Sequence, residues 1–376
     1  MPRGQRRRFV PDFDPAFGDR ALSDAQDDIV IGRWQGVRDL LGGSSGDWAR
    51  RTHRIRVLAH AAAGSSATRM WQAAEPDSPD AAVLRAATEV VGVFHRAVAS
   101  GRRAGAAQHA QGEAGRAVVD RSQVGRDRLD AVVRTCLEAA GIHPADPMPW
   151  VSLLTVARLY EDGVPRRELR RWWDELRRRD PHNVEGHIQL LRYHAARWHG
   201  THGRMYDVAR DVAGASPPGS PLPVLVQIAR AEEYRYVSES ARGRVVRGFD
   251  QHWKHELAVT EIRRTWERWI LRREDGPVPP HEVAELNYLA HAACHAGLEL
   301  EARGLFVLLG NRVAHLPWAY TGEPAAQFTA WRERLGVRGP ESDRAGGLAA
   351  PAFPGAGGRA PAPGAAQTPM SRPSLR

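Results

Sequence analysis

The residues of this chain best suited to chemistry lie between positions 287 and 295. His291 and His295 are four residues apart, so on a helix both imidazoles lie on one face, with Cys294 beside them. Zinc binds such nitrogen and sulfur ligands, and a tetrahedral site needs one or two more of them. One hypothesis is therefore a metal-dependent enzyme on a helical scaffold that uses His291, Cys294 and His295. The possible further donors are His252, His255, His281 and His315.

Other catalytic patterns are missing from the sequence. The residues between the two histidines are Ala292, Ala293 and Cys294, so the glutamate of a His-Glu-x-x-His motif is absent. His252 and His255 share one side of a predicted helix, but no nucleophile–base pair accompanies them. The sequence has no Gly-rich phosphate loop, Walker motif or Gly-x-Ser-x-Gly elbow. We therefore expect a protein that is not an enzyme and that needs no cofactor.

The elements that position residues 287–295 form a predicted helix–turn–helix unit over 282–316. Gly297 ends the first helix, because a residue without a Cβ atom easily adopts the left-handed conformation of a helix stop. Ala302 and Phe306 are four residues apart on the second helix and face the first. Ala302 lets the two helices approach, and Phe306 fills the space beside it. In chain order, the positions that carry this pattern are Leu289, Ala290, Gly297, Ala302, Phe306 and Leu309.

A period of about 34 residues recurs earlier in the chain. Asp146-Pro147 and Asp180-Pro181 are 34 residues apart, and Pro217 follows Pro181 by 36. Each interval holds two apolar helical stripes separated by a break that contains Gly or Pro, the usual punctuation between short helices. Repeated helix–turn–helix units of this length are therefore predicted.

The residue order in 282–316 and the 34-residue period resemble the tetratricopeptide repeat. The chain is similar to uncharacterised tetratricopeptide-like proteins of high-GC bacteria, and the resemblance covers roughly 24–98 and 146–335. It implies an all-α fold, an α-solenoid, and it implies no activity. Because repeat arrays form extended concave surfaces, we predict that a concave groove binds a peptide or helix of a partner protein. The predicted groove residues are Asn287, Tyr288, His291, Cys294, His295, His194 and Arg197.

The positive charge of the chain is concentrated at its two ends. Of the formal net charge of +9, residues 1–8 contribute +4 and residues 338–376 contribute +3, which leaves +2 for the rest. Lys254 is the only lysine, and the other 52 basic residues are arginines, a bias that GC-rich codons produce without any need to bind phosphate. We therefore expect no specific nucleic-acid binding. A nucleic-acid-associated factor that uses its Arg-rich termini is the remaining alternative.

The number of cysteines and the length of the apolar runs indicate the cellular compartment of the protein. Cys136 and Cys294 are 158 residues apart and do not suggest a disulfide framework, so a reducing environment is expected. No apolar run approaches the ~20 residues that a membrane helix needs. Arg6-Arg7-Arg8 is followed by Pro11-Asp12-Phe13-Asp14-Pro15 rather than by the apolar core of an export signal. A cytoplasmic protein without a membrane partner is predicted.

Composition and periodicity divide the chain into five segments. They are a basic arm at 1–20 that is disordered or loosely docked, an N-terminal helical-repeat segment of about four helices at 21–98, a linker or weak helix at 99–117, tetratricopeptide-like repeats at 118–337, and a disordered tail at 338–376. The repeat segment includes a longer helix from Phe249 to Ile270. The function that this organisation predicts is a non-enzymatic scaffold for protein–protein interaction.

Overall fold

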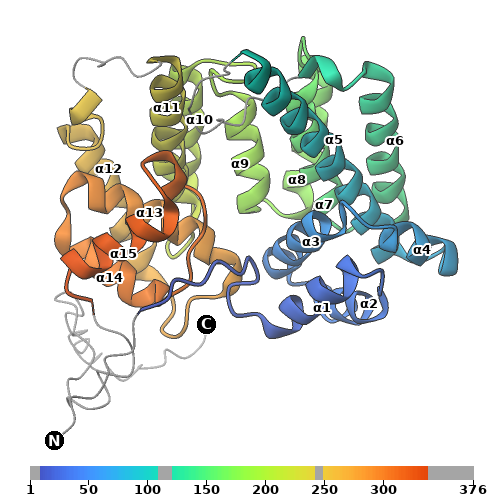
Figure 1. The fold of residues 1–376 in the computed structure, drawn as a ribbon, viewed down its shortest axis with the longest axis horizontal. Coiled ribbons are helices and arrows are strands. Elements are labelled where there is room, and N and C mark those ends of the chain that lie inside the picture. The colour runs from blue at the N-terminus through green and yellow to red at the C-terminus, as the bar shows by residue number, and fades with distance from the viewer. Residues whose placement is uncertain (1–8, 109–120, 242–248, 338–376) are drawn as a thin grey trace, which may run out of the picture. The chain divides into compact units, whose positions relative to one another are not determined.

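The computed structural model describes residues 9–108, 121–241 and 249–337, and these ranges form helices without any strand (Figure 1). The α-helices are α1 (Arg20–Val30), α2 (Gln35–Gly42), α3 (Trp48–Ala62), α4 (Ala67–Ala74), α5 (Pro79–Gln108), α6 (Arg126–Ile142), α7 (Met148–Val156), α8 (Arg166–Arg179), α9 (Val184–Tyr193), α10 (His202–Ala215), α11 (Leu225–Ala241), α12 (Glu256–Arg268), α13 (Val283–Ala296), α14 (Glu299–Leu309) and α15 (Pro324–Arg334). The short 3-10 helices are η1 (Arg121–Gln123), η2 (Ala157–Leu159), η3 (Leu222–Val224), η4 (Phe249–Gln251), η5 (Ile270–Arg272), η6 (Pro280–Glu282) and η7 (Trp318–Tyr320). The prediction of an all-α fold is confirmed for the described residues.

Local sequence signals explain where several helices begin and end. The side chains of Asp19, Asp47, Asn183 and Thr201 precede α1, α3, α9 and α10, and each accepts a hydrogen bond from a backbone N–H of the first turn. Helix α13 ends at Gly297, which has the left-handed φ of 76° predicted for it.

The helix pairs predicted at 146–215 and 282–316 are confirmed as α7–α8, α9–α10 and α13–α14. Two other expectations were wrong, and a third segment was left open by the sequence. The segment 21–98 holds five helices instead of four. Helix α5 continues to Gln108, into the segment predicted as a linker or a weak helix. The long helix expected from Phe249 is broken, because His255 is extended and caps α12 by accepting a hydrogen bond from the Ala258 N–H.

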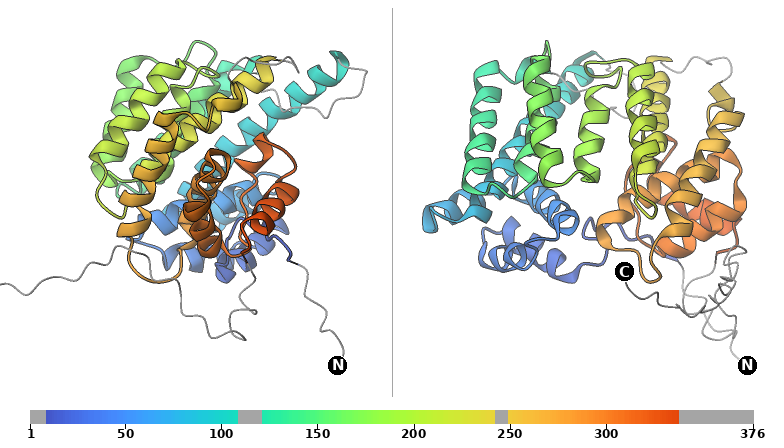
Figure 2. Two further views of the ribbon diagram at one scale, coloured as in Figure 1. Left: turned by 90° about the vertical axis from the view of Figure 1, so that its left-hand side faces the viewer. Right: turned by 180° about the vertical axis from the view of Figure 1, so that it is seen from behind.

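The odd-numbered helices from α3 to α13 pack in a row. Helix α3 packs on α5, α5 on α7, α7 on α9, α9 on α11, and α11 on α13. The even-numbered helices α6, α8, α10, α12 and α14 each pack against a member of this row (Figures 1 and 2). The odd-numbered helices therefore form one continuous layer, in which each helix contacts the next odd-numbered helix.

A buried ion network joins α3 to α5 and to the turn before α7. The Arg51 guanidinium donates from Nε to Asp146 Oδ2 (2.7 Å) and from Nη2 to Asp80 Oδ1 (2.6 Å). It also donates to the Leu41 carbonyl oxygen, 3.0 Å away. Burial alone would lower the pKa of Arg51, but the charges of Asp146 and Asp80 outweigh it and raise that pKa. The network replaces the hydration that Arg51 and Asp146 lose in the core.

The segment 1–20 was predicted as a disordered or loosely docked arm, and its described residues 9–19 include a docked part. The backbone of Asp12 bridges to 311–313, with its N–H on the Asn311 oxygen and its carbonyl accepting from the Val313 N–H, each at 2.7 Å. The Phe13 ring stacks on His315. Ring stacking and a backbone bridge thus bind this segment to the last helices, while the Arg-rich residues 1–8 lie outside the described ranges.

The described helices all belong to one unit that comprises both predicted segments, 21–98 and 118–337. The predicted tail at 338–376 and most of the predicted linker, 109–117, lie outside the described residues. In the part of the chain that the structure describes, no helix has the length and apolar character required to cross a membrane. Eleven of the twelve tryptophans lie within or against the hydrophobic core, in agreement with the packing role that their positions suggest.

Candidate functional site

The residues predicted to line a groove on α13 lie mostly in the core. Asn287 is completely buried: its Nδ2 donates to the Val283 oxygen (2.8 Å), and its Oδ1 accepts from Trp318 Nε1 (2.9 Å). His291 is also fully buried, with Nε2 3.2 Å from the Thr321 hydroxyl. The prediction that these side chains face a groove was therefore wrong. The segment between α14 and α15, which includes η7, folds over that face of α13 and supplies its partners.

The remaining predicted residues on α13 are largely enclosed as well. Cys294 is buried, and burial raises the pKa of its thiol above the ordinary value. The half-buried His295 ring lies against Trp253 and Trp331. Tyr288 is buried too, but its hydroxyl reaches α9, two helices away in the row, where it accepts from Arg192 Nη2 at 3.3 Å.

The alternative metal site does not assemble in the described part of the chain. The rings of His291 and His295 are neighbours, with centroids 4.4 Å apart, but no group of three His, Cys, Asp or Glu side chains is placed to hold a metal ion within those residues. Three of the four proposed further donors have other partners. His315 stacks on Phe13, the His255 ring contacts the Arg230 guanidinium at 2.7 Å, and His252 Nε2 lies 2.9 Å from the Arg230 oxygen.

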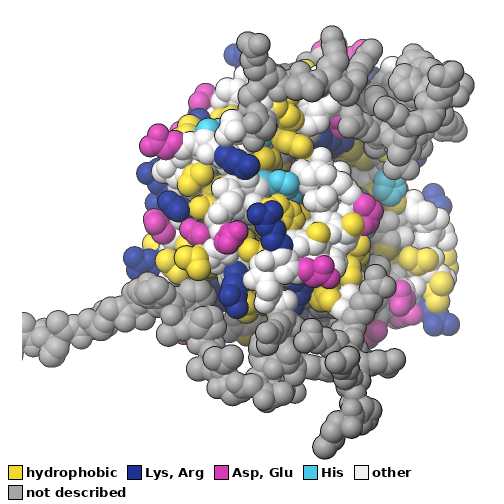
Figure 3. Space-filling view, turned by 60° about the vertical axis from the view of Figure 1, so that its left-hand side comes forward, with side chains coloured by type: hydrophobic (Ala, Val, Ile, Leu, Met, Phe, Trp, Pro, Cys, Tyr) yellow, Lys and Arg dark blue, Asp and Glu magenta, His cyan; other side chains and the backbone are white. Residues whose placement is uncertain are grey.

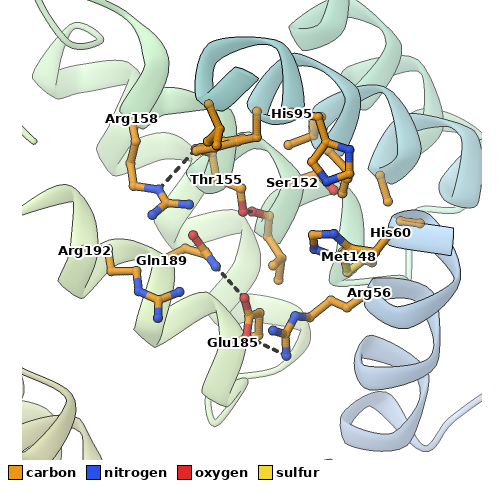
Figure 4. Close-up of a pocket in the computed structure, with 17 residues that line it drawn as sticks. Arg56, His60, His95, Met148, Ser152, Thr155, Arg158, Glu185, Gln189 and Arg192 are labelled. Carbon is orange, nitrogen blue, oxygen red and sulfur yellow. Dashed lines mark hydrogen bonds and ion pairs between the residues drawn. The ribbon is translucent and has the colours of Figure 1, made fainter. Parts of the chain in front are cut away.

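A cavity of about 910 Å³ opens instead among α3, α5, α7 and α9, the first members of the helix row (Figure 4). One end of its polar lining is formed by the guanidinium groups of Arg158 and Arg192, and the imidazoles of His60 and His95 lie opposite. The polar residues of the lining are Arg56, His60, His95, Ser152, Thr155, Arg158, Glu185, Gln189 and Arg192. Most of the other lining side chains are aliphatic, and they come mainly from α5 and α7.

The repeat period explains why these residues meet. Arg158 and Arg192 are 34 residues apart, and so are Thr155 and Gln189. Both pairs therefore occupy equivalent positions of two successive helix pairs, α7–α8 and α9–α10, and point to the same side. The 34-residue spacing was the signal in the sequence that could have identified the cavity.

Two of the three arginines in the cavity are neutralised by carboxylates. Arg56 Nη1 lies 2.9 Å from Glu185 Oε2, and Arg192 Nε lies 3.0 Å from Glu232 Oε1. Gln189 adds a hydrogen bond to Glu185. Burial by itself would lower the pKa of Arg192, but the Glu232 charge outweighs it and raises that pKa. In each of these two pairs, the carboxylate balances the charge of the arginine.

Arg158 is different, because it forms no ion pair with any described residue although it is only 8% exposed. Its guanidinium packs against two aromatic rings, 4.8 Å from the centroid of Phe94 and 4.9 Å from that of Trp198, and these two rings meet edge to face with their centroids 6.2 Å apart. Among the described residues, the Arg158 side chain donates one hydrogen bond, a long one of 3.4 Å from Nε to the Thr155 carbonyl oxygen. Burial, and next the charge of Arg192, lower the pKa of Arg158 to about 9. A buried cation of this kind is costly without a partner anion.

The charged lining continues beyond the cavity along α9 and α11. Arg197, one of the predicted groove residues, pairs with Glu239, which also accepts from Arg235 Nε at 3.0 Å. His194, another predicted residue, is half-buried at the end of α9, edge-on to Tyr193. Of the seven predicted site residues, Tyr288 and Arg197 thus contact this charged surface. Within the described ranges, the other five are not part of it.

Outside the cavity, one face of the molecule mixes both signs of charge. Figure 3 shows basic and acidic side chains interspersed with hydrophobic ones on that face, without a continuous basic area. Comparison of the chain with protein-family models, with curated proteins and with solved structures gave no match. A function for this chain is therefore proposed from the geometry of the cavity.

Proposed function

We propose that this chain is a non-enzymatic binding scaffold, a tetratricopeptide-like α-solenoid that holds a short segment of a partner protein in the cavity between α3 and α9. The observation that carries the proposal is the unpaired, nearly buried Arg158 in an open cavity of about 910 Å³. Pockets of roughly 300–1,000 Å³ with apolar walls and few polar groups are typical of ligand sites. The volume suits a few residues of an extended segment better than a whole helix.

Three features support the solenoid part of the proposal. The helix pairs recur with the 34-residue period, the odd-numbered helices pack on one another in order, and the cavity lining comes from that row alone, with η2 as the continuation of α7. Repeat arrays build binding surfaces in this way, because each unit contributes equivalent positions to one face. The partner remains a protein or peptide, as the sequence predicts.

The test fills the cavity without removing any of its charges. Thr155 lines the cavity on α7, and its hydroxyl bonds to the Val151 oxygen one turn earlier. Thr155→Trp places an indole in the space. Thr135→Trp is the matched control, since Thr135 is a half-buried helical threonine with the same type of backbone bond, to the Ala131 oxygen, and it lies outside the lining.

A phage library of random heptapeptides with free C-termini is selected on the full chain, and the enriched peptides are measured by fluorescence polarisation. Thr155→Trp is expected to weaken their binding about tenfold or more, and Thr135→Trp to leave it within about twofold. Two results would overturn the proposal. One is a selection that enriches no peptide above background, and the other is a set of peptides that bind equally well when the cavity is filled.

A further inference from the structure

We infer, building on the proposed function, that the bound segment enters the cavity with a carboxylate, and that Arg158 is the residue that receives it. The guanidinium packs against the adjoining rings of Phe94 and Trp198, and these contacts orient it before any ligand arrives. A planar guanidinium presents paired N–H donors that match the two oxygens of a carboxylate. The ligand would thus satisfy donors that the described residues leave without an acidic partner.

The charges around the cavity limit the ligand to a single negative charge. Arg56 and Arg192 are already paired with Glu185 and Glu232, so one cation, Arg158, is left over among the described lining residues. A dianion such as a phosphate monoester would bring a second charge toward Glu185 without a second free cation to balance it. A carboxylate matches the available charge.

The walls beside Arg158 define what accompanies the carboxylate. Phe94 of α5 and Val151 of α7 line the cavity together with further valines of α5. An aliphatic or aromatic group next to the carboxylate would be removed from water there, at a gain of about 25 cal/mol per Å² of apolar area buried. The predicted ligand class is therefore an apolar carboxylate, which in a partner protein corresponds to an apolar C-terminal residue.

The experiment compares ligands that differ only in this charge. Two fluorescent pentapeptide libraries of identical sequences end either in a free carboxylate or in a carboxamide, and decanoate and decyl phosphate serve as small-molecule probes. They are titrated into the full wild-type chain and into Arg158→Met, Arg158→Lys, Arg170→Met and Thr155→Trp. Arg170 is the control, because it is an exposed arginine on α8, with 84% of its side chain accessible.

For wild type, the acid library is expected to bind about 10–100-fold more tightly than the amide library, the usual effect of a charge-assisted hydrogen bond. That difference should nearly vanish in Arg158→Met, be partly kept in Arg158→Lys and be unchanged in Arg170→Met. Equal binding of acid and amide, both blocked by Thr155→Trp, would overturn the carboxylate inference but leave the proposed scaffold function standing.

Two further outcomes separate the source of the carboxylate. Binding of decanoate that requires Arg158, with neither peptide library bound, supports the carboxylate inference and overturns the proposed protein partner. Preference for decyl phosphate over decanoate contradicts the charge argument. No binding of any probe overturns both proposals.

Discussion

Replacement of Arg158 by methionine should stabilise the protein in the absence of ligand, although it removes a large buried side chain. Burial lowers the pKa of this guanidinium from its ordinary value to about 9, which corresponds to roughly 4–5 kcal/mol of unfavourable free energy at neutral pH. The two contacts with aromatic rings offset about 1–2 kcal/mol of that cost. Methionine fills similar space and keeps favourable contacts with both rings. The expected net stabilisation of Arg158→Met is about 1–3 kcal/mol.

The comparison that gives this number meaning is Arg192→Met. Arg192 lies in the same cavity but is paired with the buried Glu232. Its removal strands a carboxylate in the interior, at a cost of about 3–5 kcal/mol. The two substitutions are chemically identical, so they should change stability in opposite directions only if Arg158 lacks a partner and Arg192 has one.

Urea unfolding followed by circular dichroism measures both changes at pH 7, provided that the dependence on urea stays the same. Alkaline pH supplies a second check on Arg158. The pKa of Arg158 is about 9 in the folded chain and higher in the unfolded chain, so the folded chain loses this proton first and the wild type gains stability relative to Arg158→Met as pH rises above 9. A loss of stability in Arg158→Met as large as that in Arg192→Met would refute the reasoning, since Arg158 would then be an ordinary structural arginine.

Three further predictions concern the scaffold. Asp146→Asn, which breaks the fully buried partner of the ion network, should cost about 3–5 kcal/mol in urea unfolding, and the more exposed Asp80→Asn clearly less; similar costs would contradict the assigned burial. Burial lowers the pKa of His53 to about 3, so protonation of the unfolded chain reduces stability as pH falls below 6.5; His53→Phe should lessen that slope between pH 4 and 6 by about 1.4 kcal/mol per pH unit, and an unchanged slope would exclude this group. Gly186→Ala should cost about 1–3 kcal/mol in thermal unfolding, because a methyl group there overlaps a buried leucine side chain, whereas Gly214→Ala, with open space around it, should be neutral or stabilising.

The helix pairs were predictable because their signals are local. The left-handed stop at Gly297 and the proline-closed 34-residue period depend on residues close in sequence, and each of them corresponds to an observed helix end or pair. The burial of the predicted groove residues on α13 was not predictable in the same way. Asn287 and His291 have the spacing of an exposed polar stripe, and only the fold of the segment around Trp318 decides that this stripe is covered.

The cavity was missed for a different reason. Arginines make up 52 of the 53 basic residues, so composition alone does not distinguish Arg158 from any other. Arg158 is distinguished by the lack of a carboxylate partner among the described residues, whereas Arg192 pairs with Glu232, 40 positions later on another helix. The pairing of charges across helices is a tertiary property. The period alone, applied to charged positions as well as to prolines, would have grouped Arg158 with Arg192.

The attachment of residues 9–13 to the segment after α14 has a consequence for synthesis. Asp12 leaves the ribosome before its partners at 311–313, which follow about 300 residues later. At about 5–20 residues per second, this interval is roughly 15–60 s, during which the first helices can form while Phe13 has no ring to stack on. Residues 9–13 can therefore dock only after α14 has been synthesised. A nascent chain stalled before α14 should accordingly expose residues 9–13 to protease, and synthesis through residue 337 should protect them.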